Sequence, residues 1–328
     1  MIVKLLGLLL VISPFLCVSL STSKCSAVEL HSGRLNAASW DWDEFSDGID
    51  LRGIPGPYSF RNFCLLPWGE FWAVGGDGSV TVEFPDGTRE TQHPTQASLM
   101  SVCGTATGRA WAAGTGGTII HTDDWGKHWT QQKSGVLTDL ESVTCIDELY
   151  CWAVGRDGVV LLTDDGGERW TRASTRVNDI LYAVSFVDRN TGWAVGENGV
   201  LIKSIDGGHT WSVNYLVREM FPGSPGREIT SWNAVKFWNR KLGWVAGYEW
   251  IATTGDGGQS WTYKHAELFS GIGIGSPDGV RVWAVANEWV PSINYWSTDS
   301  GRTWSKFNGK IKEADAQPKS SRKRLRRF

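Results

Sequence analysis

The sequence predicts an all-β fold, a β-propeller of six four-stranded antiparallel blades, from two recurring motifs and the strand pattern between them. The first motif is an octet with a hydroxyl residue first, Asp third, Gly fifth and Trp eighth. Its five copies are "TDDWGKHW" (122–129), "TDDGGERW" (163–170), "SIDGGHTW" (204–211), "TGDGGQSW" (254–261) and "STDSGRTW" (297–304). Self-similarity at a fixed period is typical of repeat architectures.

The second motif occurs six times. Five copies each precede an octet, and the first copy belongs to a unit without a clean octet. Its copies are "WAVGGDG" at Trp72, "WAAGTGG" at Trp111, "WAVGRDG" at Trp152, "WAVGENG" at Trp193, "WVAGYEW" at Trp244 and "WAVANEW" at Trp283. The steps between these tryptophans are 39, 41, 41, 51 and 39 residues. The unit is therefore about 40 residues long and occurs six times, which is the repeat length of a propeller blade.

Within one unit, short runs rich in Val, Ile, Trp and Tyr alternate with turn pairs, as in "LYAVSFVD", "GWAVG", "ENG" and "VLIKS" (181–204). Such runs, broken by Asn-Gly or Asp-Gly, predict strands joined by tight hairpins. Four strands per unit form one antiparallel blade. A seventh blade is an alternative if "SWDWDEF" (39–45) belongs to a degenerate unit, although this stretch is better explained as a closing strand beside the last blade.

The octet lies on the hairpin between the third and fourth strands, where Asp accepts backbone N–H groups and Gly supplies a positive φ. It is the Asp-box motif, and a structural role is predicted for its carboxylates, with metal or substrate binding as the alternative. The five are Asp124, Asp165, Asp206, Asp256 and Asp299.

The predicted organisation is a signal peptide over residues 1–27, an N-terminal segment with a closing strand over 28–57, the propeller over 58–309 and a disordered basic tail over 310–328. The first 27 residues hold Lys4, an apolar run and small residues after it, which fits a secretory signal cleaved near Ser21 or Ala27. A retained anchor is the alternative, but Pro14 interrupts a run that is short for a membrane span. We expect a secreted or lumenal monomer without a membrane span after cleavage.

Cys145 and Cys151 bracket the turn in "TCIDELYCW", between the first two strands of the third blade. Such a pair can join a hairpin in an oxidising compartment, so we predict a disulfide between them.

The tail "PKSSRKRLRRF" carries six cations, and removing them from the formal net charge of −3 leaves −9 on the remainder. A block of this kind is usually disordered and solvated, and contact with an anionic surface or a dibasic processing site are the alternatives. The acidic body and the secretory signal argue against nucleic acid as a ligand.

The unit "LYAVSFVDRNTGWAVGENGVLIKSIDGGHTW" (181–211) resembles a repeat of the photosystem II assembly and stability factor family of Asp-box propellers, and the pattern extends over about residues 58–307. The resemblance implies a non-enzymatic scaffold, since photosynthetic members are lumenal chaperones that hold reaction-centre subunits. It also implies the thylakoid lumen as an alternative location, although no transit peptide or twin-arginine signal is visible. The family's arginine patch cannot be assigned here among Arg61, Arg156, Arg172 and Arg218.

A binding site for a protein or glycan partner is predicted where blades five and six depart from the repeat. Blades one to four have small turns between the second and third strands, whereas these two blades have larger residues there, and a long connection (217–230) precedes blade five. The alternative is that these residues only cover a wider blade edge. The candidate binding residues are Arg218, Arg227, Tyr248, Glu249, Trp250, Glu288 and Trp289.

A sialidase-like or other glycoside hydrolase is the alternative function, because Asp-boxes also occur in those enzymes. "LRGIP" (51–55) has only a partial match to a sialidase arginine motif, and no pair of catalytic carboxylates can be identified from spacing along blades. No catalytic residue, cofactor or metal site is predicted, since the six histidines have no metal-ligand spacing.

Overall fold

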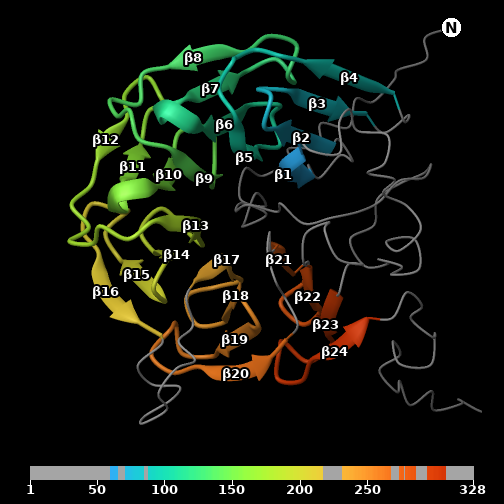
Figure 1. Cartoon of the computed structure of the whole chain (residues 1–328), viewed down its shortest axis with the longest axis vertical. Helices are drawn as coiled ribbons and strands as arrows, with labels where there is room; N and C mark the ends of the chain where they lie inside the picture. Colours follow the sequence, from blue (N-terminus) through green and yellow to red (C-terminus); the bar gives the residue numbers. More distant parts are fainter. Residues whose placement is uncertain are drawn as a thin grey trace, which may run out of the picture.

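The computed structural model describes residues 60–65, 71–84, 88–216, 231–266, 273–276, 278–285 and 294–307. Over these residues the chain forms six antiparallel sheets of four strands each, which confirms the all-β prediction and the six blades (Figure 1). The stretch 39–45, on which a seventh blade depended, lies outside the described residues.

Each sheet contains four consecutive strands, so every strand pairs with its neighbour in the sequence. The first three sheets contain β1 (Phe60–Leu65), β2 (Phe71–Gly75), β3 (Val80–Glu83) and β4 (Arg89–Gln92); β5 (Leu99–Gly104), β6 (Ala110–Gly114), β7 (Ile119–Thr122) and β8 (Thr130–Gln132); and β9 (Leu140–Cys145), β10 (Cys151–Gly155), β11 (Val160–Thr163) and β12 (Thr171–Arg172). The last three contain β13 (Leu181–Phe186), β14 (Gly192–Gly196), β15 (Val200–Ser204) and β16 (Ser212–Tyr215); β17 (Trp232–Phe237), β18 (Gly243–Gly247), β19 (Trp250–Thr254) and β20 (Thr262–His265); and β21 (Gly273–Gly275), β22 (Val282–Val285), β23 (Asn294–Ser297) and β24 (Ser305–Phe307).

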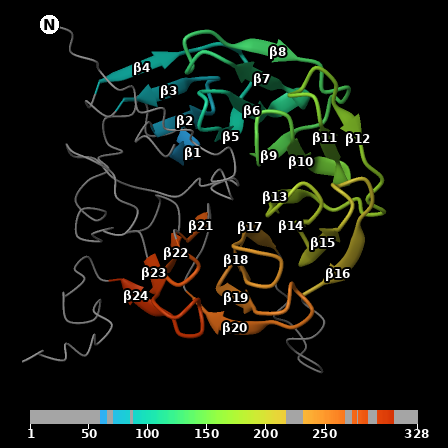
Figure 2. The same cartoon turned by 180° about the vertical axis from the view of Figure 1, so that it is seen from behind.

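The sheets are arranged around a common centre, with the first strand of each sheet innermost and the fourth at the periphery (Figures 1 and 2). Neighbouring inner strands are joined by side chains that accept backbone N–H groups. Ser101 Oγ accepts the N–H of Val143 at 3.2 Å, and Ser185 Oγ accepts that of Phe237 at the same distance. Short polar links therefore join the second sheet to the third and the fourth sheet to the fifth, beside the apolar packing.

In four blades, the tryptophan of the second strand makes a hydrogen bond to the octet of the next blade. Trp152 Nε1 donates to the carbonyl of Gly207 at 2.7 Å, and Trp193 Nε1 donates to that of Gly257 at 3.2 Å. Trp111 and Trp244 make the same contact with the fourth octet residue of the blade that follows. All four indoles are fully or almost fully buried, so each bond satisfies a donor that water cannot reach.

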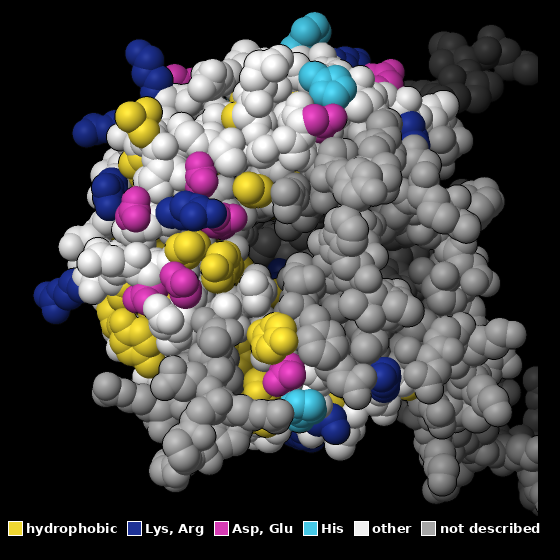
Figure 3. Space-filling model, viewed as in Figure 1, with side chains coloured by type: hydrophobic (Ala, Val, Ile, Leu, Met, Phe, Trp, Pro, Cys, Tyr) yellow, Lys and Arg dark blue, Asp and Glu magenta, His cyan; other side chains and the backbone are white. Residues whose placement is uncertain are grey.

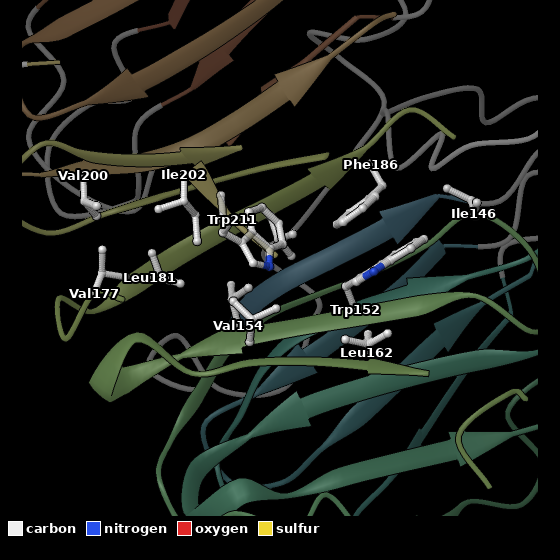
Figure 4. Packing of buried hydrophobic residues seen from close by; sticks show 13 residues of the cluster. Ile146, Trp152, Val154, Leu162, Val177, Leu181, Phe186, Val200, Ile202 and Trp211 are labelled. Carbon is white, nitrogen blue, oxygen red and sulfur yellow. The ribbon is translucent and has the colours of Figure 1, made fainter. Parts of the chain in front are cut away.

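Two of these tryptophans also stack on an aromatic ring of the next blade. Trp152 stacks on Phe186 with ring centroids 3.6 Å apart, within the apolar cluster between the third and fourth sheets (Figure 4). Trp193 stacks on Phe237 at the same distance. Each of these indoles thus contributes apolar burial and one directed hydrogen bond to the same interface.

The fifth octet residue must be glycine for two reasons, as Gly208 illustrates. Its φ is +90°, which L side chains rarely adopt. A Cβ added there would lie 2.8 Å from Nε1 of Trp152. The turn therefore needs glycine both for its own conformation and for its close approach to the preceding blade.

The interface between the first and second sheets differs from the others. Trp125 occupies the fourth octet position, where the next two copies have glycine, with a φ of 63°. Nε1 of Trp72, the equivalent donor in the first sheet, is buried and has no hydrogen-bond partner among the described residues. This interface consequently lacks the hydrogen bond that joins the four later pairs of sheets.

The hairpins between first and second strands lie at the octet end of the sheets and add ion pairs between neighbours. Arg189 of the fourth sheet contacts the Asp147 carboxylate of the third at 2.9 Å, and Arg240 of the fifth contacts Asp188 of the fourth at 2.7 Å.

Among the described residues, no helix is long and apolar enough to cross a membrane.

A disulfide joins Cys145 and Cys151, which face each other across β9 and β10 with Cα atoms 4.1 Å apart. It closes the hairpin whose Asp147 accepts the ion pair from the next sheet.

Replacing Trp152 with Phe should lower the free energy of unfolding by about 1 to 2 kcal/mol more than replacing Trp72 with Phe, because only the first change leaves a carbonyl without its donor. Both changes remove a similar apolar volume from a buried site, so Trp72→Phe is the matched control. Urea unfolding followed by circular dichroism measures both losses. Equal losses would contradict the role given to the indole hydrogen bond.

Candidate functional site

Each octet carboxylate accepts hydrogen bonds from residues of its own turn. Ser204 Oγ donates to Asp206 Oδ1 at 2.8 Å and accepts the N–H of Gly208 at 2.8 Å. The Asp206 carboxylate also accepts the N–H and the hydroxyl of Thr210, the former at 3.0 Å. The backbone bond from the seventh residue recurs at the other four copies, on Asp124, Asp165, Asp256 and Asp299.

These hydrogen bonds favour the ionised form of the carboxylates. The side chain of Ser260 and then its N–H hold the pKa of Asp256 at about 2, and the His128 side chain does the same for Asp124. At the other three copies, partial burial acts to raise the pKa and the turn hydrogen bonds outweigh it, so the pKa is lowered. Among the described residues, no group of three or more His, Cys, Asp or Glu could hold a metal ion.

Four of the seven predicted binding residues, Arg218, Arg227, Glu288 and Trp289, lie outside the described residues. Of the other three, Tyr248 and Glu249 form the tight turn between β18 and β19, and Trp250 is the first residue of β19. Tyr248 is 45% exposed, and Glu249 takes a φ of 63° and accepts the N–H of Ala266 through its carbonyl at 2.8 Å.

Trp250 differs from Tyr248 because it is partly buried. Its ring meets His265 edge-to-face at 5.1 Å and packs against the apolar cluster of the fourth and fifth sheets. Of the aromatic side chains predicted for binding, the described structure therefore presents Tyr248 to solvent and packs Trp250 on the sheet.

A set of residues that the sequence analysis did not single out lies at the same end of the sheets as these turns. In five sheets the second residue of the inner strand has no partner in the ladder, so a β-bulge separates its two neighbours. Bulges redirect side chains and are frequent beside functional sites. The five bulged residues have different chemistry, namely Arg61, Met100, Glu141, Tyr182 and Asn233.

Two of these bulges, at Glu141 and Tyr182, lie beside a network of charges on the third and fourth sheets. Arg156, in the turn after β10, places Nε 3.2 Å from Asp139 Oδ2 and 3.5 Å from Glu141 Oε1. Asp139 Oδ1 also accepts the N–H of Gly116 at 2.9 Å, from the equivalent turn of the second sheet. Arg156 and Asp139 thus connect the turn after β10 to the turn after β6 in the adjacent blade.

Tyr182 lies within electrostatic reach of this network. Partial burial and the charges of Glu197 and Glu141 raise the pKa of its phenol, and Arg156 opposes the shift. The phenol therefore stays protonated at neutral pH and can donate a hydrogen bond.

Asp179, from the connection between the third and fourth sheets, extends the same surface outward. Its carboxylate accepts Asn198 Nδ2 at 2.8 Å and the hydroxyl of Tyr215 at 3.4 Å. Tyr215 is 38% exposed at the end of the outermost strand.

We name this surface the acidic face and define it by Asp139, Glu141, Arg156, Asp179, Tyr182 and Glu197. In the space-filling view, acidic side chains gather with hydrophobic ones around a basic side chain over the left side of the ring, where the third and fourth sheets lie (Figure 3). The sequence contained a signal for part of it. In "LMSVCG", "LESVTC", "LYAVSF" and "WNAVKF" the second letter changes freely while the fourth is always Val.

The fold and the repeated turns define the chain as a β-propeller. A family model described as Photosynthesis system II assembly factor YCF48 matches residues 129–234 and 167–263, so the chain resembles that family.

Solved structures agree on the fold. The structure described as YCF48 bound to D1 peptide has a TM-score of 0.59 at 15% identity, over 77% of this chain and 83% of that one. YCF48 from Cyanidioschyzon merolae has a TM-score of 0.56 at 18% identity, over 78% and 87%. The GH74 enzyme of Niastella koreensis also has 0.56 at 18% identity, over 76% of this chain but 37% of that one. No curated protein matches the chain. At these identities the likeness establishes the propeller fold.

The lowered pKa values predict a specific loss of stability in acid. A carboxylate whose pKa is depressed on folding contributes stability that is present in full above its ordinary pKa of 3.8, and that is lost as the pH falls toward about 2. Asp256→Asn should therefore lower the melting temperature at pH 5, and its deficit should narrow between pH 4 and pH 2.

Asp164→Asn, at the exposed second position of another octet, is the control and should leave the pH profile unchanged. Thermal melts followed by tryptophan fluorescence between pH 5 and pH 2 measure both effects. A deficit of Asp256→Asn that stayed constant over this range would show that its ionisation does not stabilise the turn.

Proposed function

We propose that this protein is a non-enzymatic scaffold, resembling photosystem II assembly factors, that binds a segment of another protein on the acidic face. The observation that carries the proposal is the repeated bulge, which places a residue of different chemistry at the same end of each of five sheets. The five octets at the other end keep Asp, Gly and Trp at fixed positions, because their turns join neighbouring blades. A rigid scaffold with variable side chains at one end is the usual arrangement of a binding surface.

The chemistry of the face suits a protein ligand. Tyr182 and Tyr215 provide aromatic surface with a hydroxyl at its edge, and tyrosine is enriched at the centres of protein interfaces. A solved propeller of the family that this chain resembles is described as bound to a D1 peptide, which supports a peptide as the class of ligand. The exposed Tyr248 lies at the same end of the fifth sheet and can extend the contact.

We also propose that the chain functions in a secretory or lumenal compartment. The disulfide between Cys145 and Cys151 supports this, because disulfides persist in oxidising compartments. The apolar segment near residue 10, which lies outside the described residues, would supply the targeting signal.

Removing the aromatic surface should weaken ligand binding while the fold persists. Tyr182→Ala should lower the affinity for peptides selected from a displayed library by about 2 kcal/mol, or roughly thirtyfold, as interface tyrosines do. Tyr182→Phe keeps the aromatic ring and should therefore lower the peptide affinity less. Calorimetric titration of the selected peptides measures the affinities, and a glycan array run in parallel tests the other class of ligand.

Ile205→Ala is the control because Ile205 is 74% exposed within an octet, at the opposite end of the sheets. It should leave the affinity unchanged. Peptides that bound equally to the parent chain and to Tyr182→Ala would rule out this face as the site.

A glycoside hydrolase is the second candidate, since such enzymes need two carboxylates and the charges of Glu141 and Glu197 both act on Tyr182. The raised pKa of Tyr182 opposes a sialidase-like use of the phenol as a nucleophile. We expect no turnover of sialosides or β-glucans by the purified protein. Turnover that disappeared in Glu141→Gln or Glu197→Gln, with substrate binding retained, would instead identify an acid or base and an enzyme.

A further inference from the structure

The acidic face has more negative charge than its own cation neutralises. Arg156 pairs with Asp139 and Glu141. Asp157 in the same turn and Glu197 in the next sheet make no ion pair with any described residue. Arg156 holds Asp139 and Glu141 together, and the charges of Glu141 and Glu197 both act on Tyr182, so an extended cationic segment crossing this surface would meet several carboxylates.

The chain itself contains a segment of the opposite charge. Residues 319–327 include six cations in nine residues, namely Lys319, Arg322, Lys323, Arg324, Arg326 and Arg327. Leu325 and Phe328 add apolar side chains that can pack on exposed tyrosine rings. The guanidinium groups can pair with carboxylates in a bidentate way and stack on aromatic rings.

The segment is also long enough to reach the acidic face. The described structure ends at Phe307 in β24, at the periphery of the sixth sheet (Figure 1), and 21 further residues follow in the sequence. An extended chain of this length spans roughly 70 Å. A four-stranded sheet is only about 15 Å wide from its outer to its inner strand. Lys319 is 12 residues after Phe307, so it can lie up to roughly 40 Å from β24, which exceeds the width of the sixth sheet and leaves length to cross toward the third and fourth sheets.

We propose that the acidic face binds the chain's own basic segment, residues 319–327, and that a protein ligand must displace this segment. The inference rests on the proposed function, since the segment occupies the same face. It implies that ligands of this face carry Lys or Arg and compete with the segment for Asp157, Glu141 and Glu197.

Cross-linking of the unaltered full chain tests the contact directly. A carbodiimide joins lysine amines to carboxylates without a spacer, so peptide mapping of the monomer should find Lys319 or Lys323 coupled to Asp157 or Glu197. Glu168 is the control carboxylate, because it is exposed within an octet at the other end of the third sheet. Coupling to Glu168 as frequent as coupling to Asp157 and Glu197 would overturn the proposal.

Binding in trans gives an independent measurement. The full chain with all six cations of the segment replaced by Gln should bind a labelled peptide of residues 317–328, and the parent chain should bind it more weakly because its own segment competes. Replacing both Asp157 and Glu197 by their amides in that variant should weaken the peptide by about fivefold, as the loss of two partly screened ion pairs predicts. Glu168→Gln should have no effect, and raising the salt from 50 to 300 mM should weaken binding further.

Each outcome separates this proposal from the function on which it rests. Selected ligands that depend on Tyr182, together with no binding of the 317–328 peptide, would overturn the inference and keep the proposed function. Peptide binding without any protein ligand would support the inference and remove the function. Loss of the cross-links together with binding of the full chain to phosphatidylserine vesicles would assign the segment to an anionic membrane and overturn the proposal.

Discussion

The architecture depends on the contact of each octet turn with the tryptophan of the preceding blade. The turn brings its fourth carbonyl to the indole N–H and its fifth residue against the indole ring, as Trp152 shows with Gly207 and Gly208. A single blade cannot bury its second-strand tryptophan by itself, so the contact joins folding within a blade to association between blades. The octet sequence follows from this requirement: Asp and the hydroxyl residue fix the turn, and glycine permits its approach.

This constraint explains why the sequence predicted the fold so directly. At positions such as those of Trp193 and Asp206, the same contact requires the same residue type in successive units. These residues therefore recur at a fixed spacing that can be counted. The partial burial of Trp250 could not be foreseen, because a tryptophan after a turn is compatible both with a solvent-exposed site and with packing against the neighbouring cluster. The bulges were missed for a related reason. A bulged residue is defined by its register with the next strand, and a single strand such as "LYAVSF" does not contain that register.

The two ends of the sheets have different roles. At the octet end, the carboxylates accept several hydrogen bonds each and the hairpins are joined by ion pairs such as Arg189 with Asp147, so a substitution there disturbs the ring. At the other end, the turns keep glycine where φ is positive and the next connection passes close, as at Gly117 and Gly158, while the residues beside these glycines differ between blades. A protein of this kind can change its ligand by changing bulged and turn residues while its octets stay the same.

The acidic face lies over two sheets that three kinds of contact join. The third and fourth sheets are connected by the 2.7 Å indole hydrogen bond, by the stacking of Trp152 on Phe186 and by the ion pair of Arg189, whereas the first and second sheets lack the indole bond. A ligand that binds across rigid elements loses less free energy to ordering the protein than one that binds across mobile elements. Glu141 and Tyr182 belong to adjacent inner strands of this rigid pair. Their separation is therefore set by the interface beneath them, which is the condition for recognising an extended segment by the spacing of its charges.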